Sequence, residues 1–344
     1  MPHETFMRRC LDLASNGAST ASPNPLVGSV IVHGDRIIGE GFHHASGLPH
    51  AEVNAVNAVA DEDKPLLKDA TLYVNLEPCS HHGRTPPCCD MIIAAGIPRV
   101  VIGAMDTNAL VNGEGIRKMK EAAIDVTTGV LERESRDLNK RFFTFQEKRR
   151  PYVVLKWAQS RDGFMAPLPQ RRRRLSNALS QMLAHKWRTE EDVIFVGFNT
   201  AWVDNPSLDA RLWPGRSPHR AVYDPKLQLT DDLNIFRNDG KHLWVFNNIK
   251  TKQRGHVNLV NVDANDWVKN VLGVLHDAKC LSVLIEGGTK TIDAFLAAGA
   301  WDEARVFITP HMLGTGYRAP VTPPTQGTET RLNDDALITY FANL

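Results

Sequence analysis

Apolar and polar positions along the first 150 residues alternate in a way that predicts strands separated by helices. Apolar runs of strand length, bounded by turn residues, occur at 26–34, 36–42, 71–76 and 99–105. Helical spacing of apolar residues occurs at 5–16, 50–60 and 88–96. The first two strands are separated only by Gly34-Asp35, which predicts a hairpin. The later order strand, helix, strand predicts a βαβ unit with parallel strands.

The same alternation starts again after the charged stretch 145–151, "FQEKRRP", which we interpret as a linker. Predicted strands in this second part are 152–160, 192–198, 219–224, 242–246, 281–288 and 303–310. Predicted helices are 176–187 and 291–299. A chain of 344 residues is too long for one ordinary core. We therefore expect two α/β domains, residues 1–147 and 148–344.

Composition narrows the class of protein. The hydrophobic fraction of 42% and the charged fraction of 23% are typical of a globular protein in water. Forty basic and 39 acidic residues leave a net charge of +1, which favours neither a nucleic-acid nor a membrane partner. The N-terminal stretch has no apolar core of a signal peptide, and no run reaches transmembrane length. We expect a cytoplasmic protein.

Three of the five cysteines lie in one stretch, "NLEPCSHHGRTPPCCD" at 75–90, which follows a predicted strand and enters a predicted helix. This crowding is atypical of a disulfide framework and indicates a metal site. Cys79 lies at the end of the strand, and Cys88 in the first helical turn, where the helix dipole favours a thiolate. His50, just before another predicted helix, is the third candidate ligand. Three protein ligands leave a position for water, the pattern of catalytic zinc.

Glu52 lies two residues after His50 and is our candidate for the group that moves protons. Residues i and i+2 point to different sides of a helix, which favours one ligand and one acid/base group. Zinc lowers the pKa of a bound water to about 7. The ordered set H-x-E and P-C…C is the signature of zinc-dependent nucleobase deaminases. Iron and a purely structural zinc site, with His81 or His82 as fourth ligand, remain alternatives.

The remaining cysteines have a simpler interpretation. Cys89 is one residue from Cys88, about 100° round the helix, so we expect a packed thiol rather than a ligand. Cys10 and Cys280 lie in apolar patterns, which predicts core positions.

Several motifs resemble one family, the bifunctional riboflavin-biosynthesis deaminase/reductases. "TASPNPLVGSVIV", "GEGFHHASGLPHAEVNA" and "LEPCSHHGRTPPC" resemble its deaminase half, including the eight-residue spacing between the two cysteines. The resemblance continues through the second domain. It implies a cytidine-deaminase-like three-layer α/β domain followed by a dihydrofolate-reductase-like α/β domain. The absence of G-x-G-x-x-G agrees with a reductase of that kind rather than a Rossmann domain.

The resemblance implies roles for the first domain. His50, Cys79 and Cys88 would hold zinc, Glu52 would be the proton shuttle, and Asn24 would line the pyrimidine pocket. The implied reaction is hydrolytic removal of the 2-amino group of a diaminopyrimidinone that carries a phosphoribosylamino arm.

The second domain would reduce the ribosyl group of the product to ribityl with NADPH. The residues that match the family's cofactor contacts are Ala158, Thr200, Asp204, Gly288, Thr289, Lys290, Thr291, Ile292, Asp293 and Ala294. Those that match its substrate contacts are Arg188, Leu208, Arg211 and Glu286. The arginines suit a phosphate, because a guanidinium binds two oxygens at once. The strand, Gly-Gly and helix start at 281–299 suit an anion at backbone N–H groups.

One segment departs from the family. Many members carry a Ser and a Trp where this chain has Arg172 and Arg174, within the run Arg171–Arg174. These arginines suggest a contact with the 2′-phosphate of NADPH, an exposed loop, or a weakened reductase. We favour the exposed loop.

The sequence therefore predicts a cytoplasmic enzyme that uses zinc and NADPH and acts on a small phosphoribosylaminopyrimidine, and we expect a homodimer. The nearest alternative keeps the deaminase and makes the second domain catalytically weak or non-catalytic. A second alternative is a tRNA or nucleoside deaminase with an unrelated partner domain, which the eight-residue cysteine loop disfavours. A third is a binding protein with structural zinc.

Overall fold

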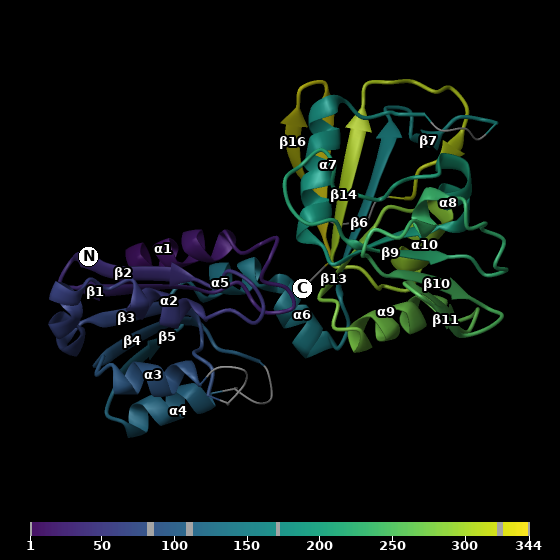
Figure 1. The fold of residues 1–344 in the computed structure, drawn as a ribbon. Coiled ribbons are helices and arrows are strands. Elements are labelled where there is room, and N and C mark those ends of the chain that lie inside the picture. Colours follow the sequence, from purple (N-terminus) through teal and green to yellow (C-terminus); the bar gives the residue numbers. More distant parts are fainter. Residues whose placement is uncertain (1, 81–85, 108–112, 170–172, 322–325, 343–344) are drawn as a thin grey trace. The chain divides into compact units, whose positions relative to one another are not determined.

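A computed structural model describes residues 2–80, 86–107, 113–169, 173–321 and 326–342. Within it the chain forms two compact units, Met1–Lys148 and Arg149–Leu344. Each unit has its own sheet and its own apolar core (Figure 1). None of the helices in the described ranges is long and apolar enough to cross a membrane.

The first unit is built on a five-stranded sheet with the strand order β2-β1-β3-β4-β5. The strands are β1 (Gly28–His33), β2 (Arg36–Phe42), β3 (Thr71–Leu76), β4 (Arg99–Ala104) and β5 (Asp125–Thr128). The helices are α1 (His3–Ser15), α2 (Ala51–Asn57), the 3₁₀ helix η1 (Asp61–Asp69), α3 (Cys88–Ala94), α4 (Glu114–Glu121), α5 (Glu132–Leu138) and α6 (Lys140–Lys148). The predicted hairpin is confirmed: β1 and β2 are antiparallel, and Gly34 at the turn has a φ of 63°.

Alternate residues of the central strands pack on opposite faces of this sheet, which gives three layers. Val30, Val32, Tyr73 and Val101 pack with residues of α1. Their neighbours Ile31, Leu72, Val100 and Ile102 pack on the other face with residues of α2, α3 and α4. Figure 1 shows α1 along one face and α3 and α4 along the other. Strands β3, β4 and β5 are parallel, as the predicted βαβ unit requires.

The predicted linker at 145–151 is wrong over its first four residues. They lie in α6, where Phe142, Phe143 and Phe145 are buried. Phe142 and Phe143 pack with Leu76 and Ala104, the last residues of β3 and β4. The charged residues of this stretch suggested a linker, but the buried aromatic residues before them form one face of a helix. This helix continues to Lys148.

The second unit contains a ten-stranded sheet with the order β11-β12-β10-β9-β8-β13-β6-β14-β17-β16 and a small sheet of β7 and β15. The strands are β6 (Tyr152–Ser160), β7 (Phe164–Ala166), β8 (Val193–Gly197), β9 (His219–Tyr223), β10 (Leu243–Asn247), β11 (Lys252–Arg254), β12 (Val257–Asn261), β13 (Ser282–Ile285), β14 (Glu303–Thr309), β15 (Tyr317–Arg318), β16 (Thr328–Leu332) and β17 (Asp335–Phe341). The helices are α7 (Ala178–Glu190), α8 (Phe198–Asp204), η2 (Asn234–Phe236), α9 (Trp267–Asp277) and α10 (Thr289–Ala297).

The strands from β12 to β14 in this order are parallel, and β11, β17 and β16 are antiparallel additions at the edges. Helices cover both faces of the sheet. One face packs against α9 and α10 around Phe195, Phe246 and Phe295. The opposite face packs against α7 through Ala184 and Trp187. Carboxyl ends of parallel strands are where such sheets bind ligands.

Candidate functional sites

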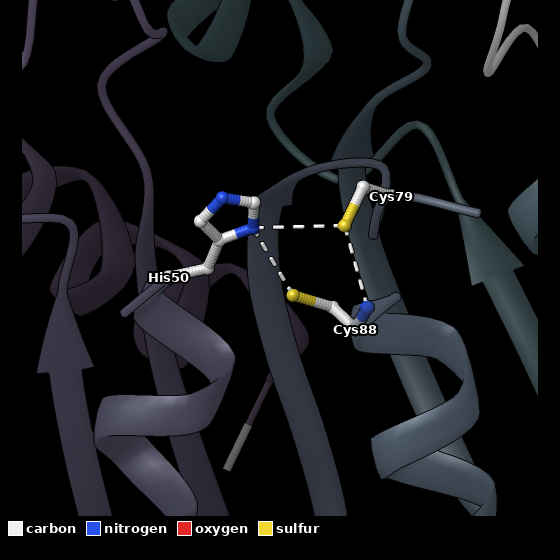
Figure 2. Close-up of side chains that lie close together, drawn as sticks. All are labelled: His50, Cys79 and Cys88. Atoms are coloured by element: carbon white, nitrogen blue, oxygen red, sulfur yellow. Dashed lines mark hydrogen bonds between the residues drawn. The ribbon is translucent and has the colours of Figure 1, made fainter. Parts of the chain in front are cut away.

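His50, Cys79 and Cys88 form the first candidate site (Figure 2). The Nδ1 atom of His50 lies 3.3 Å from Sγ of Cys88 and 3.6 Å from Sγ of Cys79. All three donor atoms lie within 4.8 Å of one another. For a zinc ion with usual bond lengths and tetrahedral angles, the nitrogen and a sulfur would be about 3.6 Å apart. The spacing of the donors therefore fits zinc, with Nδ1 as the nitrogen ligand.

Three secondary-structure ends bring these donors together. His50 is the N-cap of α2, and its side chain makes no capping hydrogen bond. Its ring faces the sulfurs of Cys79 and Cys88 instead. Cys88 is the first residue of α3, after Pro87. Cys79 follows β3, and its sulfur accepts a hydrogen bond from the backbone N–H of Cys88, 3.3 Å away. The carboxyl end of a parallel strand and the N-termini of two helices thus meet at one edge of the sheet.

The chemistry of the donors also fits a cation. The Cys88 thiol hydrogen-bonds Cys79 and lowers the pKa of Cys79 to about 4, whereas the same contact raises the pKa of Cys88. One sulfur is therefore held as a thiolate beside the helix N-terminus. A second thiolate so close requires a positive charge, which a metal ion supplies.

Glu52 lies in the first turn of α2 and is only 3% exposed. It is within hydrogen-bonding reach of Cys88. Burial, together with the charge of Cys79, raises the pKa of Glu52 to about 7. A buried carboxyl group that can both take and give a proton near neutral pH suits a proton shuttle.

Asn24 is joined to this cluster through His43, a residue that the sequence reasoning missed. Nδ1 of His43 lies 3.1 Å from the carbonyl oxygen of Pro49, which can only accept, so Nδ1 carries the proton. Nε2 then accepts a hydrogen bond from the amide Nδ2 of Asn24, 3.0 Å away. Burial lowers the pKa of His43, in agreement with a neutral ring. Among the described residues none donates to the side-chain oxygen of Asn24, which can therefore accept a hydrogen bond from a ligand.

Two buried asparagines fix the loop that carries Asn24. Oδ1 of Asn75, on β3, accepts from the backbone N–H of Gly28, and its Nδ2 donates to the carbonyl of Leu26. Asn139 holds both backbone groups of Leu26, with distances of 2.7 and 2.9 Å. The ring of His43 also lies edge-on to that of His50, with centroids 5.3 Å apart. The loop, His43 and the metal ligands therefore form one connected site.

The second candidate site is a cavity of about 260 Å³ in the second unit. It is lined by six of the predicted residues, namely Arg188, Thr200, Asp204, Leu208, Arg211 and Glu286. Glu286 directly follows β13, and Thr200 and Asp204 lie on α8, directly after β8. The cavity thus opens at the carboxyl ends of neighbouring parallel strands.

Glu286 is the most constrained group of this cavity. Its carboxylate accepts two hydrogen bonds from Arg188, both 2.8 Å long, and Nζ of Lys156 lies 3.5 Å away. Burial alone would raise the pKa of Glu286, but Arg188 and Lys156 outweigh it and hold it at about 2. The bidentate edge of Arg188, which we expected to meet a phosphate, is therefore occupied by Glu286. Lys156 was not predicted, although it precedes Ala158 by only two residues.

The other predicted cofactor residues lie outside the lining of this cavity. Ala158 is on β6, and Gly288 to Ala294 form the N-cap and first turns of α10. Ile292 and Ala294 pack in the core, and the backbone N–H of Ile292 donates to the carbonyl of Gly288, so any N–H group available to a ligand lies before Ile292. The hydroxyl of Thr289 donates to the carbonyl of Arg318. Gly197 at the end of β8 and Gly287 just after β13 allow α10 to lie close to the ends of these strands. A Cβ at either position would lie under 3 Å from Thr291 of α10.

The remaining predictions have mixed outcomes. Cys10, Cys89 and Cys280 are buried thiols, as predicted. Arg173 and Arg174 are exposed, as a loop would be, but they also line the cavity. Arg171, Arg172, His81 and His82 lie outside the described residues.

Comparison with known families agrees with this geometry. Residues 1–104 match the family described as cytidine and deoxycytidylate deaminase zinc-binding region. Residues 151–341 match the RibD C-terminal domain. The two matched regions contain the zinc-type cluster and the cavity, respectively. The expected fold class, a cytidine-deaminase-like domain followed by a reductase domain, is thereby confirmed.

Similar proteins extend over nearly the whole chain. The riboflavin biosynthesis protein RibD of Aquifex aeolicus is 38% identical over 91% of this chain and 88% of its own length. That of Escherichia coli is 34% identical over 94% and 92%. A Thermotoga maritima structure described as a diaminohydroxyphosphoribosylaminopyrimidine deaminase/5-amino-6-(5-phosphoribosylamino)uracil reductase has a TM-score of 0.90 at 34% identity, covering 99% of this chain and 98% of its own. The chain belongs to the RibD family of bifunctional riboflavin-biosynthesis enzymes, which use zinc and NADPH.

Proposed function

We propose that this chain catalyses two successive steps of riboflavin biosynthesis. The first is hydrolytic deamination of 2,5-diamino-6-(5-phosphoribosylamino)pyrimidin-4(3H)-one. The second is reduction of the ribosyl group of the deaminated product to ribityl. The observation that carries this proposal is the pairing, on one chain, of a His-Cys-Cys cluster beside buried Glu52 with a cavity formed around Glu286. Membership of the RibD family supports both steps, and nothing in the comparisons supports a non-catalytic second domain.

We assign the deamination to a domain of residues 1–147, with His50, Cys79 and Cys88 as zinc ligands. Zinc, when bound there, activates water for attack on the ring carbon that carries the amino group. Glu52 takes up a proton at its carboxylate and delivers it to the departing amine. The oxygen of Asn24 accepts a hydrogen bond from the pyrimidine, and His43 holds the amide in that orientation.

We assign the reduction to a domain of residues 148–344, where NADPH supplies the hydride. We assign substrate contacts to Arg188, Leu208, Arg211 and Glu286, which share one cavity. Glu286 is ionised and fixed by Arg188, so it can accept hydrogen bonds from sugar hydroxyls without turning. We assign the cofactor to the neighbouring groups, which are Ala158, Thr200, Asp204 and Gly288 to Ala294. The first-turn N–H groups of α10 suit its phosphates.

We also propose that the enzyme works in the cytoplasm as a homodimer without a nucleic-acid partner. The net charge of +1 supports the last point, because nucleic-acid binding depends on concentrated positive charge. Light scattering coupled to size exclusion would test the dimer, and a single-chain mass across concentrations would reject it.

Separate assays test the two activities. Zinc-loaded protein should release ammonia from the diaminopyrimidine, and the deaminated ribosylamino compound should cause oxidation of NADPH. Asp204→Ala should lower the second rate and leave the first unchanged, because Asp204 lines the cavity of the second unit. Ammonia release without any NADPH oxidation by the wild type would reject the second activity.

A further inference from the structure

The cavity of the second unit carries an excess of positive charge. Its charged lining consists of the cations Lys156, Arg173, Arg174, Arg188 and Arg211 and the anions Asp204 and Glu286. Five positive groups face two negative groups, which leaves an excess of three. Such a cavity attracts anions and binds them more strongly than an exposed surface, because its walls reduce solvent screening.

The inner cations already have partners within the protein. Arg188 and Lys156 both contact Glu286, and Arg188 also donates to the carbonyl of Asp209, 2.9 Å away. Arg211 is paired with the carboxylate of Asp209. Arg188, Lys156 and Glu286 are nearly buried and form the inner part of the cavity, whereas Arg211 is half exposed.

Arg173 and Arg174 differ from these groups. Throughout the described parts of the chain, neither guanidinium has a hydrogen bond or an ion pair, yet both line the cavity. The chain just after them is anchored. Leu175 is buried, and Asn177 caps α7 and donates to the carbonyl of Leu332 and the carboxylate of Asp334. The two arginines thus lie next to a fixed segment, with their donors available.

His185 gives a second, independent indication of a ligand. Its side chain lines the same cavity and is only 6% exposed, and its buried Nδ1 has no hydrogen-bond partner among the described residues. A buried, unpaired polar atom is costly unless a ligand or water satisfies it. Burial and the nearby Arg188 and Arg211 lower its pKa to about 4, so the ring is neutral and offers one donor.

We propose that Arg173 and Arg174 form a phosphate-binding wall of this cavity and determine its preference for phosphorylated ligands. Two guanidinium groups that line one cavity suit a phosphate monoester, whose oxygens accept paired N–H donors. This inference rests on the proposed reductase function, which supplies two sources of such a group. One is the terminal phosphate of the substrate's ribosyl arm, and the other is the phosphate that distinguishes NADPH from NADH.

The test compares binding of matched ligands by calorimetry, without turnover. Ribose 5-phosphate against ribose reports the substrate phosphate, and NADP⁺ against NAD⁺ reports the cofactor phosphate. The variant Arg173→Gln/Arg174→Gln should lose at least about tenfold in affinity for one phosphorylated member, since hydrogen bonds to charged groups are stronger than neutral ones. The unphosphorylated member of that pair should bind as before. The control Lys250→Gln/Lys252→Gln removes the same charge from exposed positions outside the cavity lining.

The phosphorylated ligand that loses affinity in the variant identifies the source of the phosphate. A loss for either ribose 5-phosphate or NADP⁺ supports the proposal. Unchanged affinity for both phosphorylated ligands overturns it, as does an equal loss with the control variant. Circular dichroism and thermal unfolding of the variant exclude misfolding as the cause. NADPH oxidation by the wild type is measured separately. A failed oxidation assay with intact, arginine-dependent phosphate binding would reject the reductase step alone, and the reverse result would reject only the phosphate wall.

Discussion

Arg188 and Glu286 are joined by two hydrogen bonds of 2.8 Å, from Nε to Oε1 and from the terminal NH2 nitrogen to Oε2. Both side chains are nearly buried, with 12% and 10% of their surfaces exposed. The pair comes from α7 and the end of β13, which are 98 residues apart in sequence. It therefore fixes an anionic group in the cavity and links two elements of the second unit.

Glu286→Gln should impair the second unit specifically. It leaves Arg188 and Lys156 without a carboxylate, and loss of one partner of a buried ion pair typically costs about 3–5 kcal/mol. We expect less stability in urea unfolding of this unit, greatly reduced NADPH oxidation and unchanged ammonia release.

Asp231→Asn is a matched control for Glu286→Gln. It breaks the exposed pair between Asp231 and Arg254, which should cost no more than about 1 kcal/mol. Equal stability losses in the two variants would contradict the interpretation of the Glu286 pair.

Glu52→Gln should separate metal binding from catalysis in the first unit. Gln has nearly the same size but cannot exchange a proton, so zinc content should stay at the wild-type level. Deamination should fall about 10²–10⁴-fold, the usual contribution of general acid/base catalysis. Metal analysis and ammonia release measure the two effects. Loss of zinc in this variant would show instead that Glu52 is a ligand, and unchanged turnover would reject the shuttle.

Much of the central fold could be predicted, because its strands are buried and their patterns are strong. β3 and β6 occupy the predicted ranges 71–76 and 152–160. The peripheral elements gave weaker signals. All residues of β11 are exposed, and so are four of the five in β16, so neither shows the alternation of a half-buried strand. α5 buries only Ser135 and therefore lacks an apolar face.

The metal ligands could be predicted because cysteine and histidine at strand and helix ends are rare and chemically distinctive. His43 could not, since its role comes from two hydrogen bonds whose partners, Asn24 and Pro49, depend on the folded loop. The same holds for Arg188, whose sequence position suggested phosphate binding. Only the fold shows that Glu286 occupies its bidentate edge.

His43 should act on deamination through Asn24, which a double-mutant cycle can test. Asn24→Ala removes the acceptor for the pyrimidine, whereas His43→Ala frees the amide to rotate. Because both changes affect one hydrogen-bonded unit, the double variant should lose little more kcat/KM than Asn24→Ala alone, a coupling of about 0.5–3 kcal/mol. Zinc content serves as the check on the metal site. Strictly additive losses would contradict the positioning role.

The stability of the second unit should decrease below neutral pH because of His185. Its folded-state pKa is about 4, against 6.5 for an unperturbed histidine. The unfolded chain therefore binds the proton first, and stability is complete above about pH 6.5 and is lost as the pH falls toward 4. The loss should be at most about 3 kcal/mol.

Urea unfolding at several pH values measures this effect. His185→Gln should weaken the dependence over that window without abolishing it, because burial also lowers the pKa of His219 in this unit to about 4. His311→Gln, at an exposed position, should retain the wild-type curve. A variant of His185 with the full wild-type dependence would show that another group is responsible.

The most direct test of the two-step account supplies only the diaminopyrimidine substrate and NADPH to the purified protein, and follows oxidation of NADPH. We expect oxidation after a lag, oxidation slowed at least about 10²-fold with Glu52→Gln, and full recovery of that variant when the deaminated compound is added. Oxidation at the wild-type rate by Glu52→Gln from the diamino compound would contradict the order of the two steps. Failure of the wild type to oxidise NADPH after complete deamination would contradict the bifunctional assignment.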